Sequence, residues 1–170
     1  MKWIIAIICA VVISTLILLA PLWTVFTFTE TRTDNPKIHY ISVNNEKFFQ
    51  TKFTHSIHLT DVIESYELLP SRNIRLVSME YEDVAIGMPG YAEEGQSLTY
   101  ENGVYTLRSD DVILKDFTLY IGNVDYDLFF MYEGQVIDLK TELTKGKSYL
   151  FQAQKISFYE KMKGVKLNGR

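Results

Sequence analysis

The sequence predicts an all-β fold, an antiparallel sandwich or barrel-like domain of about nine short strands, preceded by one N-terminal transmembrane helix. Two observations lead to this prediction. The chain carries no charged residue between Lys2 and Glu30. After that run, short segments rich in β-branched and aromatic residues alternate with Gly, Asn and Asp turns, and aromatic residues make up 14% of the chain. The pattern does not choose between a sandwich and a barrel.

The N-terminal run is long enough to cross a membrane. From Trp3 to Trp23 it consists almost entirely of Ile, Val, Leu and Ala, and a spanning helix needs about 20 apolar residues. A cleavable signal peptide usually has a shorter apolar region, of roughly 7 to 15 residues, and a small-residue cleavage site. We therefore expect residues 1–29 to form a transmembrane signal-anchor. Lys2 marks the inner side and the aromatic Trp23 and Phe26 mark the outer interface, which predicts a single-pass cell-membrane protein with the bulk of the chain extracytoplasmic.

The remaining chain divides into three parts. We expect a polar linker at 30–37, an extracytoplasmic β-domain at 38–158 and a basic C-terminal tail at 159–170. The only cysteine, Cys9, lies in the apolar run, so a disulfide within the β-domain is excluded.

Strand patterns recur through the expected β-domain, bounded by turn residues. A first hairpin is expected between 38–43 and 48–55, and Asn102-Gly103 predicts a tight type I′ turn. The expected strands are 38–43, 48–55, 62–69, 74–82, 98–105 (as a hairpin), 112–121, 126–132, 136–139 and 148–158.

One long loop interrupts this rhythm. Residues 82–96 contain three glycines and one proline. A loop of this length in a compact domain is usually functional or disordered. A functional loop and a loop that only closes one end of the sheet both remain open.

Charge is distributed unevenly along the chain. Residues 61–142 contain 17 acidic and five basic residues, whereas 145–170 contain seven basic and one acidic residue. An acidic body excludes nucleic acid as a partner, because a nucleic-acid binder needs a basic contact surface. The tail is expected to be solvated and disordered, or else to return to anionic lipid or to the acidic body through Lys161, Lys163, Lys166 and Arg170.

The segment 53–64 is the main candidate for a functional site, because it holds two of the three histidines. A nucleophilic site would use Ser56 with a histidine base, but neighbouring residues of a strand point to opposite faces and no glycine-flanked elbow surrounds Ser56. A metal site would use four residues spaced every three positions: His55, His58, Asp61 and Glu64. The favoured interpretation is a ligand-contact or structural segment, in which His55 bonds to a group at the strand end and Ser56 caps the following turn. His39 is expected to be an exposed strand residue.

Three motifs together resemble a known family. They are His55-Ser56-Ile57 followed by Thr60, Val62 and Glu64; the loop segment Val-Ala-Ile-Gly-Met-Pro at 84–89; and Ile137-Asp138-Leu139 followed by Gly146. Their spacing resembles the bacterial domain of unknown function numbered eighteen-fifty. Asp61 stands where that family usually has proline, and Val84, Ala85 and Ile86 differ from its loop. The resemblance implies a membrane-anchored companion of TAXI-type TRAP transporters, which carry organic anions, and hence an accessory role in transport.

The leading hypothesis is a membrane-tethered accessory or binding domain that is not an enzyme. Its partners would be the membrane and transporter subunits or a solute-binding protein, with no cofactor and no metal. The loop 82–96 and the histidine segment would form one contact surface, oriented by a hydrogen bond between His55 and Glu64. The expected contact residues are His55, Ser56, Glu64, Gly87, Met88 and Pro89. The alternative is a metal-dependent or serine hydrolase of the cell envelope that uses His55, Ser56, His58 and Glu64.

Overall fold

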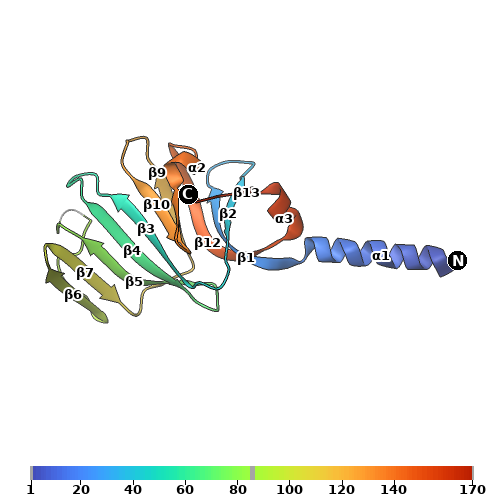
Figure 1. The fold of residues 1–170 in the computed structure, drawn as a ribbon, viewed down its shortest axis with the longest axis horizontal. Coiled ribbons are helices and arrows are strands. Elements are labelled where there is room, and N and C mark those ends of the chain that lie inside the picture. Colours follow the sequence, from blue (N-terminus) through green and yellow to red (C-terminus); the bar gives the residue numbers. More distant parts are fainter. Residues whose placement is uncertain (1, 85–86, 170) are drawn as a thin grey trace.

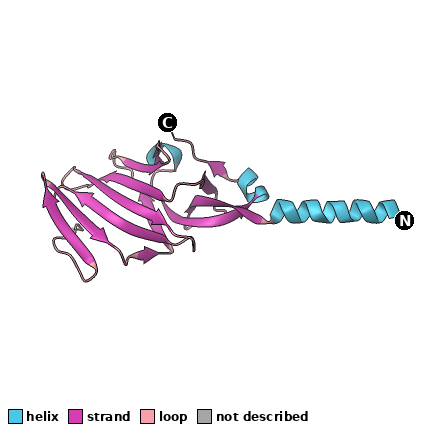
Figure 2. Ribbon diagram, turned by 60° about the horizontal axis from the view of Figure 1, so that its bottom comes forward, coloured by secondary structure: helices cyan, strands magenta, loops and turns pink. Residues whose placement is uncertain are grey.

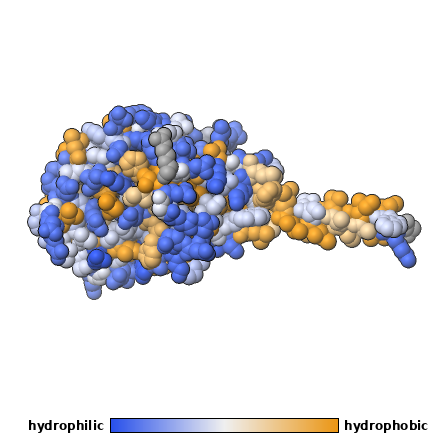
Figure 3. All heavy atoms as spheres, in the orientation of Figure 1, coloured by the Kyte–Doolittle hydropathy of each residue, from blue (hydrophilic) through white to orange (hydrophobic). Residues whose placement is uncertain are grey.

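The computed structural model describes residues 2–84 and 87–169, which form a β-rich body with one projecting helix (Figure 1). The helix, α1 (Lys2–Leu19), has no buried residue and is long and apolar enough to cross a membrane. Figure 3 shows it as a largely hydrophobic projection from a mainly hydrophilic body. A helix that is apolar on all sides and packs against no core suits a lipid environment. A membrane anchor and a signal sequence both have this length and composition.

The body consists of two sheets that face each other, with helical turns at its edges (Figure 2). The first sheet has the order β13-β2-β1-β12-β9 and the second the order β11-β10-β3-β4-β5-β7-β6, with β8 beside β5. Among the described strands, all pairings are antiparallel except the one between β13 and β2. The expectation of an all-β fold is confirmed, and within the described ranges the arrangement is a sandwich and not a closed barrel.

The elements of the first sheet are β1 (Pro21–Glu30), β2 (Ile38–Ser42), β9 (Asp116–Ile121), β12 (Lys147–Ser157) and β13 (Val165–Lys166). The elements of the second sheet are β3 (Phe48–Thr54), β4 (Asp61–Leu68), β5 (Ile74–Tyr81), β6 (Gln96–Glu101), β7 (Val104–Ser109), β8 (Ile113–Leu114), β10 (Leu128–Tyr132) and β11 (Gln135–Asp138). Two short helices, α2 (Leu139–Glu142) and α3 (Phe158–Lys163), complete the fold.

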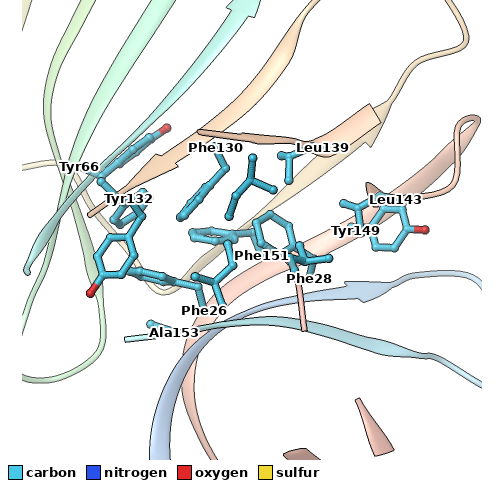
Figure 4. Packing of buried hydrophobic residues seen from close by; sticks show 14 of the residues in the cluster. Phe26, Phe28, Tyr66, Phe130, Tyr132, Leu139, Leu143, Tyr149, Phe151 and Ala153 are labelled. Atoms are coloured by element: carbon cyan, nitrogen blue, oxygen red, sulfur yellow. The ribbon is translucent and has the colours of Figure 1, made fainter. Parts of the chain in front are cut away.

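An aromatic core joins the two sheets (Figure 4). Phe26 of β1 lies 4.7 Å from Phe49 of β3 between ring centroids, and Phe28 lies 5.6 Å from Phe130 of β10. Offset and edge contacts of this kind each contribute about 0.5–1.5 kcal/mol beyond area burial. Since the described part of the chain has no disulfide, this cluster is the main source of cohesion between the sheets.

The structure corrects the expected boundary between anchor and domain. The helix ends at Leu19, and residues 25–28 are buried in the body as part of β1. A central strand that is buried on both faces is as apolar as a membrane segment, so the two merge into one hydrophobic run in the sequence. Residues 31–37 connect β1 to β2 within one sheet, so they are not a linker to the membrane.

Strand partners also differ from expectation. β2 pairs with β1, while β3 pairs with β4 and β10, so the expected hairpin of 38–43 with 48–55 is wrong and the connection crosses between the sheets. The expected strand 112–121 divides into β8 and β9, which belong to different sheets. The hairpin of β6 and β7 is confirmed, because Asn102 and Gly103 have φ values of 52° and 87°, which a type I′ turn requires.

The C-terminal residues 159–169 are folded, which corrects the expected disordered tail. Ser157 begins α3 with a capping box, in which its hydroxyl accepts from the Glu160 amide and the Glu160 carboxylate accepts from the Ser157 amide. Leu167, just after β13, is buried in the main core.

Candidate functional site

The histidine segment forms a closed turn between β3 and β4, on the side of the body away from α1 (Figure 1). The His55 amide donates to the Thr60 carbonyl at 2.8 Å, and the Leu59 amide donates to the His55 carbonyl at 2.9 Å. The Nδ1 atom of His55 accepts long hydrogen bonds from the Ile57 and His58 amides, at 3.4 and 3.5 Å. One nitrogen of His55 therefore supports the turn, as expected for a residue at a strand end, and Ser56 lies exposed within the turn.

A contact between two side chains connects this turn to the loop that follows β5. His58 Nδ1 lies 2.9 Å from Asp83 Oδ2. The contact forms because β5 lies next to β4 and antiparallel to it, so the start of the loop reaches the end of β4 that carries the turn. Sequence reasoning missed Asp83, since its only signal was a carboxylate directly after an expected strand.

The loop packs back onto the inner face of the second sheet. The buried hydroxyl of Tyr81 donates to the Pro89 carbonyl, and Met88 packs against the small buried cluster that Val62, Tyr81 and Leu107 form. Gly87 has a φ of 92°, a left-handed conformation that disfavours other residues. Ala85 and Ile86, which belong to the loop motif, lie outside the described residues.

A groove of about 530 Å³ lies between the loop and the sheet. We call it the distal groove. Its floor is apolar, and its edge carries Glu93 and Gln96. The sequence segment 80–116, which supplies most of the lining, contains nine acidic and only two basic side chains. The apolar part of the lining consists of Leu76, Met79, Met88, Pro89 and Leu107.

Glu64 lies on the inward-facing side of β4, next to the distal groove. Its cross-strand neighbours are Thr51 and Met79, the latter in the groove floor. Glu64 Oε2 accepts hydrogen bonds from Thr51 Oγ1 at 2.9 Å and from the Tyr66 hydroxyl at 2.8 Å. Burial raises the pKa of Tyr66, and the Glu64 charge raises it further, so this phenol remains a donor. Glu64 is thus held by Thr51 and Tyr66, which corrects the expected pairing with His55.

The four residues of the expected metal site do not converge: the His55 and His58 rings lie 5.6 Å apart, but the two carboxylates are held elsewhere. Asp61 and Glu64 point to opposite faces of β4, and Asp61 pairs with Lys52 at 2.6 Å on the outer face. The three-residue spacing would align these groups on a helix, but the segment is a turn and a strand. Among the described residues, no group of three or more His, Cys, Asp or Glu side chains is arranged to hold a metal ion.

His39 differs from the exposed residue that was expected. It is half-buried, and its ring lies 5.8 Å from that of Tyr149 in an edge-on contact. It therefore belongs to the edge of the core.

A family model matches the part of the chain that contains these elements. The model of a family described as domain of unknown function (DUF1850) matches residues 49–139. The chain belongs to this family. The DUF1850 match runs from β3 to the first residue of α2, so it contains the histidine turn, Glu64 and the loop motif. No curated protein and no solved structure matches the chain significantly. In this DUF1850 chain α1, β1 and β12 lie outside the matched residues.

Proposed function

We propose that this DUF1850 protein is a membrane-tethered extracytoplasmic domain that assists a TAXI-type TRAP transporter of organic anions. It does so by binding a protein component of that transporter, the membrane subunit or the solute receptor, in the distal groove. The observation that carries the proposal is the groove itself. Its apolar floor with convergent polar groups is the usual form of a recognition site.

Charge supports a protein partner over the transported solute. Glu93 in the lining and the acidic excess of segment 80–116 would repel an organic anion, and Glu64 adds a fixed carboxylate beside the floor. A partner segment with apolar side chains and a basic flank complements both features. Two methionines in the lining, Met79 and Met88, can adapt to such a segment because their side chains are flexible.

The position of the groove fits a tethered domain. β6 and β7, which lie beyond the groove, are at the end of the body farthest from α1 (Figure 1). With α1 in the bilayer, the groove would face components that extend away from the membrane surface.

Site-directed crosslinking in membranes tests the proposal. A photo-reactive amino acid replaces Tyr91, which lines the groove and is 72% exposed, or Tyr120 of β9, which is 60% exposed in the other sheet. We expect a transporter subunit or receptor to crosslink at position 91 and not at position 120. Equal labelling at both positions, or no transporter component at position 91, would contradict the proposal.

A matched pair of truncations gives a second test. Met88→Ala removes a groove side chain, whereas Met131→Ala removes a methionine that lies away from the groove, on β10. Retention of the transporter component should fall about tenfold in Met88→Ala, the loss typical of an anchoring interface residue. It should be unchanged in Met131→Ala.

A further inference from the structure

The geometry points to a second binding site, at the membrane-proximal end of the body, which holds the phosphate headgroup of an anionic phospholipid. This inference rests on the membrane tether of the proposed function, and it concerns a different surface. The site is a cleft of about 790 Å³ between the start of β1 and two turns, at 43–47 and 68–72. We call it the basic cleft.

The basic cleft concentrates positive charge on a chain whose net charge is −4. Its lining has one acidic residue, Glu46, against four basic ones. Within residues 2–84 and 87–169, no carboxylate forms an ion pair with any of these four. They are Lys47, Arg72, Lys155 and Lys161.

Position relative to α1 places the cleft at the level of lipid headgroups. The 18 residues of α1 extend about 27 Å, close to the hydrocarbon thickness of a bilayer. Leu22 and Trp23, which line the cleft, lie three and four residues after Leu19, the last residue of α1. A bilayer that contains α1 therefore ends beside the mouth of the cleft.

The short helix α3 supports the same orientation, because it lies beside the junction of α1 and β1 (Figure 1). The ring of Phe158 lies 5.9 Å from that of Trp23, and together they form a small apolar notch with Ile17 and Leu18 of α1. Phe158 is 42% exposed and Met162 is 59% exposed. Aromatic and apolar groups beside lysines are typical of segments that rest in the interface.

The basic groups lie on ordered elements: Lys47 and Arg72 belong to turns, Lys155 to β12 and Lys161 to α3. The Tyr132 hydroxyl accepts from the Asn44 amide at 3.1 Å and donates to the Glu46 carbonyl at 3.0 Å, which fixes the turn before Lys47. Arg72 has a φ of 69°, in the left-handed region usual for Gly or Asn, and its amide donates to the Leu69 carbonyl at 2.8 Å. Lys161 Nζ lies 5.8 Å from the Trp23 ring centroid.

The basic side chains of the cleft are suitable hydrogen-bond donors for a phosphate group. A guanidinium and several ammonium groups bind phosphate oxygens by charge-assisted hydrogen bonds. The apolar wall of Leu22, Leu69 and Trp23 favours a phosphate that carries a lipid over one free in solution. Each such cation near an anionic surface favours binding about fivefold.

Quenching of Trp23 fluorescence tests the inference in the full chain. Trp3→Phe leaves Trp23 as the single tryptophan, and the protein is placed in nanodiscs of phosphatidylcholine with phosphatidylglycerol. Brominated acyl chains are carried by one lipid or the other at equal mole fraction. We expect brominated phosphatidylglycerol to quench Trp23 at least about fivefold more effectively per lipid than brominated phosphatidylcholine, since one cation alone supplies that factor.

Two charge-matched variants provide the comparison. Arg72→Gln with Lys155→Gln and Lys161→Gln should abolish the preference for phosphatidylglycerol. Arg108→Gln with Lys115→Gln and Lys145→Gln, which lie outside the cleft, should keep it. Circular dichroism confirms that both variants are folded. The preference should also persist when soluble glycerol phosphate is added.

The outcomes separate the two proposals. If both lipids quench Trp23 equally, or if both variants lose the preference for phosphatidylglycerol to the same extent, the headgroup site is overturned and the tether stands. If soluble glycerol phosphate abolishes the preference for phosphatidylglycerol, the lipid is overturned as the source of the phosphate. Absence of quenching by either lipid means that α1 is not inserted, which overturns the tether and the headgroup site together.

Discussion

His58 and Asp83 connect two segments that are separated by two strands in the sequence. Their 2.9 Å contact fixes the turn between β3 and β4 against the loop that forms the distal groove. The imidazole and the carboxylate are 31% and 51% exposed, so their contact contributes little to the free energy of unfolding. We interpret its role as positional.

The first prediction concerns this pair. His58→Gln and Asp83→Asn should each lower the free energy of unfolding by less than about 1 kcal/mol, with a coupling of about 0.2–1 kcal/mol in a double-mutant cycle measured by urea denaturation. Both should reduce crosslinking from position 91, because the loop loses its fixed position. Full crosslinking in both variants would contradict the positional role.

The second prediction concerns the hydrogen bond from Tyr66 to Glu64. Tyr66→Phe leaves the carboxylate with one donor fewer and should lower the free energy of unfolding by about 1.5–3 kcal/mol, as expected for a bond to a charged group. The matched change Tyr132→Phe removes bonds to neutral backbone groups and should cost about 0.5–1.5 kcal/mol. Equal losses in urea denaturation would show that Glu64 is not held as a charged acceptor.

The third prediction concerns acid pH. Burial lowers the pKa of His39 below its ordinary value, although a hydrogen bond with the Phe28 backbone and the charges of Glu30 and Glu142 act in the opposite direction. The unfolded chain therefore takes up a proton at about pH 6.5 before the folded chain does. Stability from the neutral ring is present above that pH and is lost as the pH falls below it.

His39→Phe keeps an aromatic ring beside Tyr149 and removes the titrating group. The decrease in urea midpoint between about pH 7 and about pH 5 should be smaller in this variant than in the wild type. His58→Gln leaves His39 intact, so the part of the decrease in urea midpoint that His39 causes should be the same as in the wild type. An unchanged pH profile in His39→Phe would remove His39 as the cause.

The fourth prediction concerns β1. Phe26→Ala should lower the free energy of unfolding by about 3–5 kcal/mol, whereas Phe158→Ala on the surface should cost about 0.5 kcal/mol or less. A chain that begins at Ala20 should fold, and one that begins at Thr31 should not, because it lacks the central strand of the first sheet. Thermal unfolding followed by circular dichroism distinguishes these outcomes. A folded product from the shorter chain would show that β1 is dispensable.

Local patterns in the sequence were enough to predict the class of fold and several elements. The apolar helix and the β6–β7 hairpin at Asn102-Gly103 each depend on residues close together in the chain, so composition and turn chemistry predict them. The histidine segment and the loop 82–96 were also visible as local departures in composition.

Only the tertiary structure decided the boundary after Leu19, because a buried strand and a membrane helix are equally apolar in sequence. It also decided the partners of β2 and β3, the contact of His58 with Asp83 and the holding of Glu64 by Tyr66. The basic cleft combines residues from positions 47, 72, 155 and 161, which no short pattern unites. Strand pairing and sheet packing bring distant residues together, and those long-range contacts are absent from any local window of the chain.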